Sequence, residues 1–155
     1  MRDIRTDTRI LYEKYADVLY RAAYARLLSA ADAEDAVAET FGKYLHKKPE
    51  FRDQAHEKAW FLRVCINTCT DLMRRRTVRS YTPLEDLAEV LPAEEKDRGV
   101  LESVYELPEK YRMCVILYYF EDFSVEETAK ALQISGSAVK MRLSRAREML
   151  KSALV

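Results

Sequence analysis

The sequence predicts an all-α protein of two small helical domains joined by an acidic linker. Gly and Pro are scarce, with three and four in 155 residues, whereas helix-favouring Ala, Leu, Glu, Arg and Lys are abundant. Apolar residues also recur at spacings of three and four through most of the chain, which is the periodicity of an amphipathic helix. We therefore expect one domain at residues 1–80, a linker at 81–99, and a second domain at 100–155, which ends in a helix-turn-helix.

Three helices are expected in the first domain. The first spans about residues 8–30, and the second spans 33–47, where Pro49 ends the region because proline cannot continue a helix. The third runs from about 58 to 76 and carries a broad apolar sector, so the three helices should pack as a small bundle. The apolar residues of the first helix are Ile10, Leu11, Tyr15, Val18, Leu19, Ala22 and Ala23.

Charge is unevenly distributed, although the formal net charge is zero. Residues 84–109 carry nine acidic side chains against Lys96 and Arg98. Basic side chains gather in two other places, at 74–79 and along the last helix. Because DNA responds to local potential, the zero sum does not exclude a nucleic-acid partner.

A helix-turn-helix is predicted at residues 124–150. Ser124 and Glu127 have the spacing of a capping box, which starts the first helix. Residues 133–136 read as a turn, after which Ser137 can cap the second helix. We expect Arg142 and Arg145 on the side away from that helix's apolar seam, with Lys140 and Arg147 nearer to it. The seam consists of Val139, Leu143, Ala146 and Leu150.

Several classes of function find little support in the sequence. We see no nucleophile–base pair, no metal-ligand cluster and no phosphate-binding Gly loop, so we expect no enzymatic activity, cofactor or metal. Cys65 and Cys69 lie in an apolar helical run and are interpreted as buried structural residues. The odd cysteine count and the lack of a secretory signal indicate a reducing, cytoplasmic location. The longest apolar run, 113–120, is too short to insert into a membrane.

Three segments, in order, resemble one family. Residues 32–41 (DAEDAVAETF) resemble its polymerase-binding helix, and 51–76 resemble its segment for the −10 promoter element. Residues 107–112 (LPEKYR) and the helix-turn-helix resemble its −35-reading domain. The chain is thus similar to the extracytoplasmic-function (ECF) sigma factors, which are sigma-70-type initiation subunits of bacterial RNA polymerase.

This resemblance implies binding to core RNA polymerase (its β and β′ subunits) and to promoter DNA, with an anti-sigma factor as a further candidate partner. The residues it assigns to polymerase binding are Asp32, Asp35 and Glu39. Those for the −10 element are Phe51, Arg52, Asp53, Gln54, Asn67, Arg74, Arg75 and Arg76. Those for the −35 element are Ser137, Ala138, Lys140, Met141, Arg142 and Arg145.

Within the −10 set, residues 51–55 are expected to form a loop that holds a flipped base. Phe51 is equally compatible with a place in the hydrophobic core, and Trp60 is assigned mainly to the core. The sequence also departs from the family pattern at four positions. Ala38 replaces a polar residue, Ala138 replaces a DNA-facing Thr, and Gln133 and Asp122 stand where residues that tolerate positive φ are frequent.

Two alternative functions remain at this point. A helix-turn-helix regulator that never joins polymerase would account for residues 107–155 but leaves the first eighty residues without a role. An enzyme or metal sensor would have to be built around the three cysteines, which are Cys65, Cys69 and Cys114.

Overall fold

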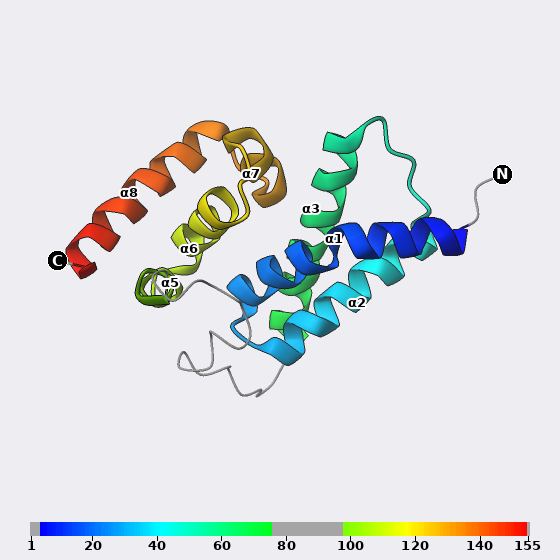
Figure 1. Cartoon of the computed structure of the whole chain (residues 1–155), viewed down its shortest axis with the longest axis horizontal. Coiled ribbons are helices and arrows are strands. Elements are labelled where there is room, and N and C mark those ends of the chain that lie inside the picture. The colour runs from blue at the N-terminus through cyan, green and yellow to red at the C-terminus, as the bar shows by residue number, and fades with distance from the viewer. Residues whose placement is uncertain (1–3, 76–97, 155) are drawn as a thin grey trace. The chain divides into compact units, whose positions relative to one another are not determined.

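The computed structural model describes residues 4–75 and 98–154, and within these ranges the chain forms helices and loops without any strand. This confirms the all-α prediction. The chain divides into two compact units, Met1–Arg79 and Ser80–Val155 (Figure 1). Most of the predicted linker lies outside the described residues, as does Arg76. The last two linker positions, 98 and 99, belong instead to a helix.

The first unit consists of α1 (Ile4–Leu27), α2 (Ala30–Lys47) and α3 (Gln54–Arg75), and each helix packs on the other two (Figure 1). The first helix ends earlier than expected because Leu28 adopts φ 55°, which breaks the helical path. Ser29 then starts α2, and its Oγ accepts a hydrogen bond from the backbone N–H of Asp32 at 3.2 Å.

Phe61 on α3 is the centre of the core of the first unit and is fully buried. Rings from all three helices and from the loop before α3 surround it, at centroid distances of 4.8–6.1 Å. Aromatic pairs at such distances add to the stabilisation that comes from burial alone. Ile10, one of the apolar residues of α1, is 56% exposed and lies outside this core. The surrounding rings are Tyr15, Phe41, Tyr44, Phe51 and Trp60.

In the second unit, residues 109–120 form a continuous helical segment of two types. Its C-terminal part, Ile116–Phe120 (π-helix η3), follows α6 (Glu109–Val115) and has the wider hydrogen bonding of a π-helix. The other helices are α5 (Arg98–Tyr105), α7 (Val125–Leu132) and α8 (Gly136–Leu154). Helix α8 packs on α5, α6 and α7, so it is the central element of this unit.

A buried arginine joins α5 to α6. Arg112 is only 6% exposed, and its guanidinium donates to the carbonyl oxygens of Tyr105 and Leu107, at 3.3 and 3.1 Å. These carbonyls lie at the last residue of α5 and two residues beyond it, where a helix leaves acceptors without intrahelical donors. A cation is also favoured at a helix C-terminus because the helix dipole is negative there. Arg112 therefore fixes the turn between the two helices.

Replacing Phe61 with Ala is expected to destabilise the first unit by about 3–5 kcal/mol, because it leaves a cavity between five rings. Trp60 is the one tryptophan of the chain and contacts Phe61, so its fluorescence in a urea titration reports this unit. Tyr12→Ala is the matched control, since Tyr12 is 52% exposed. Equal free energies of unfolding for the two variants would contradict the central role of Phe61.

Candidate nucleic-acid interface

Helices α7 and α8 form the predicted helix-turn-helix. The Ser124 Oγ accepts from the N–H of Glu127 at 3.0 Å, and the Glu127 carboxylate accepts from the N–H of Ser124 at 2.9 Å. This confirms the capping box. Gln133 ends α7 with φ 58°, and Asp122 adopts φ 56°, as expected for positions that often require positive φ. Such backbone costs about 1 kcal/mol or more at a residue other than glycine.

The start of α8 differs from the prediction. The helix begins at Gly136, and the Oγ of Ser135 accepts from the N–H of Ala138 at 3.0 Å. Ser135 therefore caps α8, and the assignment of the cap to Ser137 was wrong. Serine is a preferred N-cap residue, and Ser135 lies only two positions before Ser137, so residue type alone does not distinguish the two. Ser137 lies in the first turn and is exposed, which leaves its hydroxyl accessible to a partner.

The apolar seam of α8 lies in the core of the second unit. Val139, Leu143 and Ala146 are 0–3% exposed, and Leu150 is half-buried nearer the end of the helix. Among the residues expected at the −35 element, Ala138 is half-buried and Lys140 is exposed, and Met141 is 54% exposed. Helix α8 therefore packs through a narrow stripe and leaves its opposite side open to solvent.

Of the two arginines expected on that open side, one is exposed as expected, and the other lies against α6. Arg142 is half-buried and hydrogen-bonds the Cys114 thiol of α6. Arg145 is exposed and lies near enough to the hydroxyl of Tyr111 to lower the pKa of Tyr111. Both cations therefore lie near side chains of α6.

The opposite flank of α8 makes a polar contact to the π-helix. The exposed guanidinium of Arg147 donates to the hydroxyl of Tyr119 at 2.9 Å. Tyr119 is itself 47% exposed, and its ring lies against Tyr118 at 4.9 Å. The sequence analysis did not single out Tyr111 or Tyr119. Helical spacing alone could not find them, because both contacts join residues 28 to 34 positions apart.

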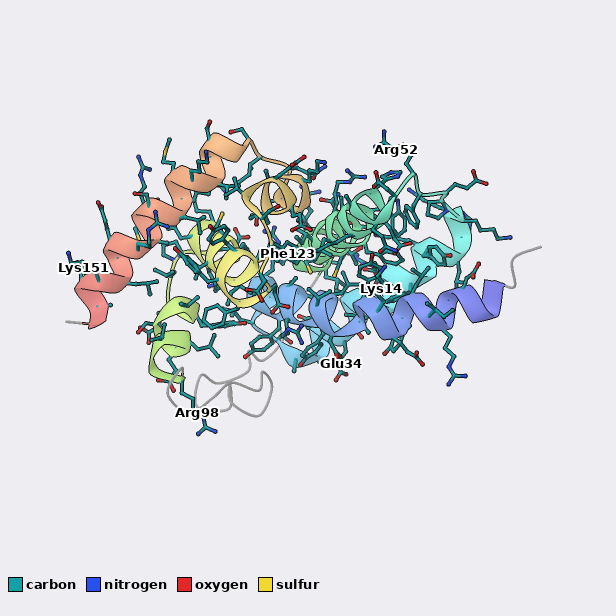
Figure 2. The ribbon with its side chains drawn as sticks, turned by 45° about the horizontal axis from the view of Figure 1, so that its top comes forward. Lys14, Glu34, Arg52, Arg98, Phe123 and Lys151 are labelled. Atoms are coloured by element: carbon teal, nitrogen blue, oxygen red, sulfur yellow. The ribbon has the colours of Figure 1, made fainter. Side chains whose placement is uncertain are left out.

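In the first unit, the residues expected at the −10 element lie along one loop and one helix. Phe51 is half-buried, with its ring 5.9 Å from that of Trp60 and 6.1 Å from that of Phe61, so it takes part in the core. Arg52 is exposed, and Figure 2 shows it at the tip of this loop. The loop is shorter than expected, since Gln54 and the following alanine already belong to α3.

The start of α3 explains this difference. The Oδ1 of Asp53 accepts from the N–H of His56 at 2.8 Å, which is the side-chain bond of a helix N-cap. The carboxylate expected to contact DNA therefore also has a structural role. Asn67 and Arg74 are exposed further along α3, so their side chains are accessible to a nucleic acid.

Arg75 belongs to the residues expected to bind DNA. It contacts Glu39, which belongs to the residues expected to bind polymerase. Its guanidinium lies 3.2 and 3.3 Å from the two carboxylate oxygens of Glu39 on α2. Both side chains are substantially exposed, so the pair adds less than about 1 kcal/mol to stability. The contact places the end of α3 beside the α2 surface.

The other two polymerase candidates differ from each other, since Asp35 is exposed whereas Asp32 is only 3% exposed and offers little surface.

The cysteines are distributed over both units. Cys65 and Cys69 are buried on α3, where their mutual hydrogen bond and burial raise the pKa of the Cys69 thiol, whereas Cys114 lies in the second unit. Within the described ranges, no three His, Cys, Asp or Glu side chains gather as metal ligands would. In the same ranges, no helix has the length and apolar character needed to cross a membrane.

Comparison with known proteins also divides the chain into two successive parts. The family model for sigma-70 region 2 matches residues 11–88, and that for sigma-70 region 4 matches residues 99–150. The RNA polymerase sigma factor SigV of Bacillus subtilis is 30% identical over 138 residues, covering 87% of this chain and 83% of SigV. The ECF RNA polymerase sigma factor SigM of Mycobacterium tuberculosis is 28% identical, covering 93% of this chain and 75% of SigM.

A solved structure supports the fold. The sigma factor RpoE from Bartonella quintana, in complex with the anti-sigma factor NepR, matches with a TM-score of 0.75 at 23% identity, over 96% of each chain. The chain contains two sigma-70 regions in order. It is similar to named sigma factors over nearly its full length, and it shares the fold of a sigma factor. This chain belongs to the ECF sigma factors of the sigma-70 family.

Proposed function

We propose that this chain is an initiation subunit that binds core RNA polymerase, recognises the −10 and −35 promoter elements and promotes strand opening. The observation that carries the proposal is the match of region 2 and region 4 to successive parts of the chain. In this proposal residues 1–80 bind polymerase and the −10 element, 81–99 link the domains, and 100–155 bind the −35 element. The protein would act in the bacterial cytoplasm, where polymerase and promoter DNA are found.

The work of such a protein is binding, so we propose no enzymatic activity. Opening a duplex requires unpaired bases to be held more tightly than paired ones. Aromatic surfaces and a few hydrogen-bonding groups hold the bases, while cations hold the phosphates. The loop before α3 supplies Phe51 and Arg52, and α3 supplies Asn67 and the exposed arginines of its last turn. In this proposal the first unit binds the opened −10 strand.

The second unit supplies a duplex reader. A recognition helix enters the major groove with its N-terminal turns nearest the base edges. The exposed Ser137, Lys140 and Met141 lie in those turns of α8. Arg145 extends the set by one turn and lies beside the hydroxyl of Tyr111. We propose that this helix reads the −35 element.

The third partner in the proposal is a regulator. RpoE, the structural match, was crystallised with an anti-sigma factor. We propose that an anti-sigma factor also restrains this chain, by competing for surface that polymerase needs. The β and β′ subunits of core polymerase are the proposed partners of the α2 surface around Asp35 and Glu39.

The experiment that tests the proposed function is transcription by core polymerase from a random promoter library, with and without the purified chain. We expect initiation only when the chain is present. The promoters used should share one −35 element and one −10 element at a constant separation. A stand-alone regulator would instead bind promoter duplex tightly without core enzyme. Tight duplex binding by the chain alone, with no core-dependent initiation, would favour that alternative.

Charge reversal of Asp35 and Glu39 together is expected to weaken binding to core polymerase while the fold stays intact. Exposed charges contribute little to stability, but a docking surface depends on their sign. Affinity can be measured by titrating labelled protein with core enzyme. The matched control reverses Glu13 and Asp17, which are also exposed and four residues apart, on α1. Equal affinities for both double variants would exclude the Asp35 and Glu39 surface as the docking site.

Replacing Asn67 with Ala is expected to change which −10 base is preferred, because a lost base contact affects one position and not its neighbours. Replacing Arg74 should instead weaken open-complex formation on all sequences similarly, since a phosphate contact carries no sequence information. Open complexes are measured on promoters substituted at each −10 position. Glu50→Ala, at an exposed position in the loop, is the control. An unchanged preference in Asn67→Ala would place the base contact elsewhere.

At the −35 element, Arg145→Ala is expected to cost about 1–3 kcal/mol at one base pair, the usual value of a bidentate arginine–guanine contact. Tyr111→Phe should cause a smaller loss at the same base pair, because it removes only the group that orients Arg145. Arg147→Ala, on the opposite flank, should alter the salt dependence and leave the preference unchanged. Transcription from a −35 substitution series checks this, and identical profiles for Arg145→Ala and wild type would reject Arg145 as a base reader.

A further inference from the structure

His56, in the first turn of α3, contacts three consecutive residues of the preceding loop. Its Nδ1 accepts a hydrogen bond from the backbone N–H of Arg52 at 3.1 Å. Its own backbone N–H donates to the Oδ1 of Asp53 at 2.8 Å. Its ring lies edge-on to Phe51, with centroids 5.5 Å apart and an interplanar angle of 82°. One side chain and its amide therefore fix the segment that the proposed function assigns to the flipped base.

The turn that carries His56 is itself firmly held. The neighbouring Glu57 accepts from the Lys14 ammonium at 3.0 Å and from the Tyr15 hydroxyl at 2.8 Å, both from α1. Lys14 also donates to the side chain of Gln54, and Figure 2 shows Lys14 on α1. Burial, together with the bond to Glu57, raises the pKa of Tyr15, so its hydroxyl remains a donor. His56 therefore extends from a support fixed on the core.

The hydrogen bond to Arg52 also specifies the chemical form of the imidazole. A ring nitrogen accepts a hydrogen bond only when it carries no proton, so His56 is in the neutral form protonated at Nε2. In this form the ring orients the peptide between Phe51 and Arg52 while the charged side chain of Arg52 stays exposed. A base entering the loop would meet a backbone that is already oriented, which reduces the ordering cost of binding.

We propose that His56 is the positioning residue of the −10 loop, and that its Nδ1 acceptor maintains the base preference of this chain. The proposal rests on the proposed function, because it assumes that the loop reads a −10 base. It assigns His56 an indirect role, since the imidazole acts through the Arg52 backbone and Phe51 and does not contact the base. His56 is half-buried against the loop, although the sequence gives no local sign of such a role.

The decisive comparison is between His56→Leu and His56→Asn. Leucine is apolar and lacks an acceptor, whereas the Asn Oδ1 is as many bonds from Cα as the imidazole Nδ1 is. Holoenzyme made with each variant is assayed for open complexes on the preferred promoter and on promoters with a substituted −10 base. We expect His56→Leu to reduce the preference ratio roughly 2- to 10-fold, the effect of one neutral hydrogen bond. His56→Asn should retain the ratio.

A second measurement uses the free protein and needs no polymerase. Hydrogen exchange of the Arg52 amide should be faster in His56→Leu and near wild type in His56→Asn. The amide of Lys48, which donates to the carbonyl of Tyr44 at the start of the loop, is the internal control. Trp60 fluorescence in urea verifies that both variants are folded.

The possible failures are distinguishable. If wild-type protein gives no core-dependent initiation, the proposed function fails and this inference fails with it. If wild type initiates but His56→Leu keeps the full preference ratio, only the role of His56 is overturned. Equal losses in His56→Leu and His56→Asn would also overturn it, since they would show that ring packing matters and the acceptor does not.

Discussion

The packing of Phe61 among five other rings is the interaction on which the rest of the first unit depends. It brings α1, α2 and α3 together, and it also holds Phe51, so the loop before α3 is part of the same core. A loop with one aromatic in the core cannot move independently of the helices. The exposed Arg52 is therefore presented from a fixed backbone. The DNA contacts proposed for this loop would rely on rigidity that comes from buried apolar surface.

The second unit meets a different constraint. The same nineteen residues of α8 must pack on the domain core and, in the proposed function, also contact DNA. A narrow seam satisfies the packing, and the side chains on its two flanks make polar contacts to α6 and the π-helix. Arg145 and Arg147 each lie beside a tyrosine hydroxyl, which favours one arrangement of each long side chain before any partner arrives. Ordering such side chains in advance lowers the entropic cost of association. The family's mode of DNA recognition is thus compatible with a helix that also stabilises its own domain.

The distribution of charge connects the two proposed partners. Arg75 of the expected DNA set and Glu39 of the expected polymerase set lie in contact across α2 and α3. The pair is exposed and weak, so either partner can displace it at low cost. In the proposed function, polymerase docking on α2 and phosphate binding at the end of α3 would therefore use neighbouring surface.

The sequence by itself determined the helical class, the capping box at Ser124 and the seam of α8, because these follow from local periodicity and short-range hydrogen bonds. It also determined the family, through motifs that lie in order along the chain. Only the tertiary structure decided that Asp32 is buried, that Arg142 faces Cys114 and that His56 holds the loop. Burial and side-chain contact depend on which helix lies beside which. A helical pattern gives the face of each residue, but the neighbour on that face comes from residues distant in the sequence.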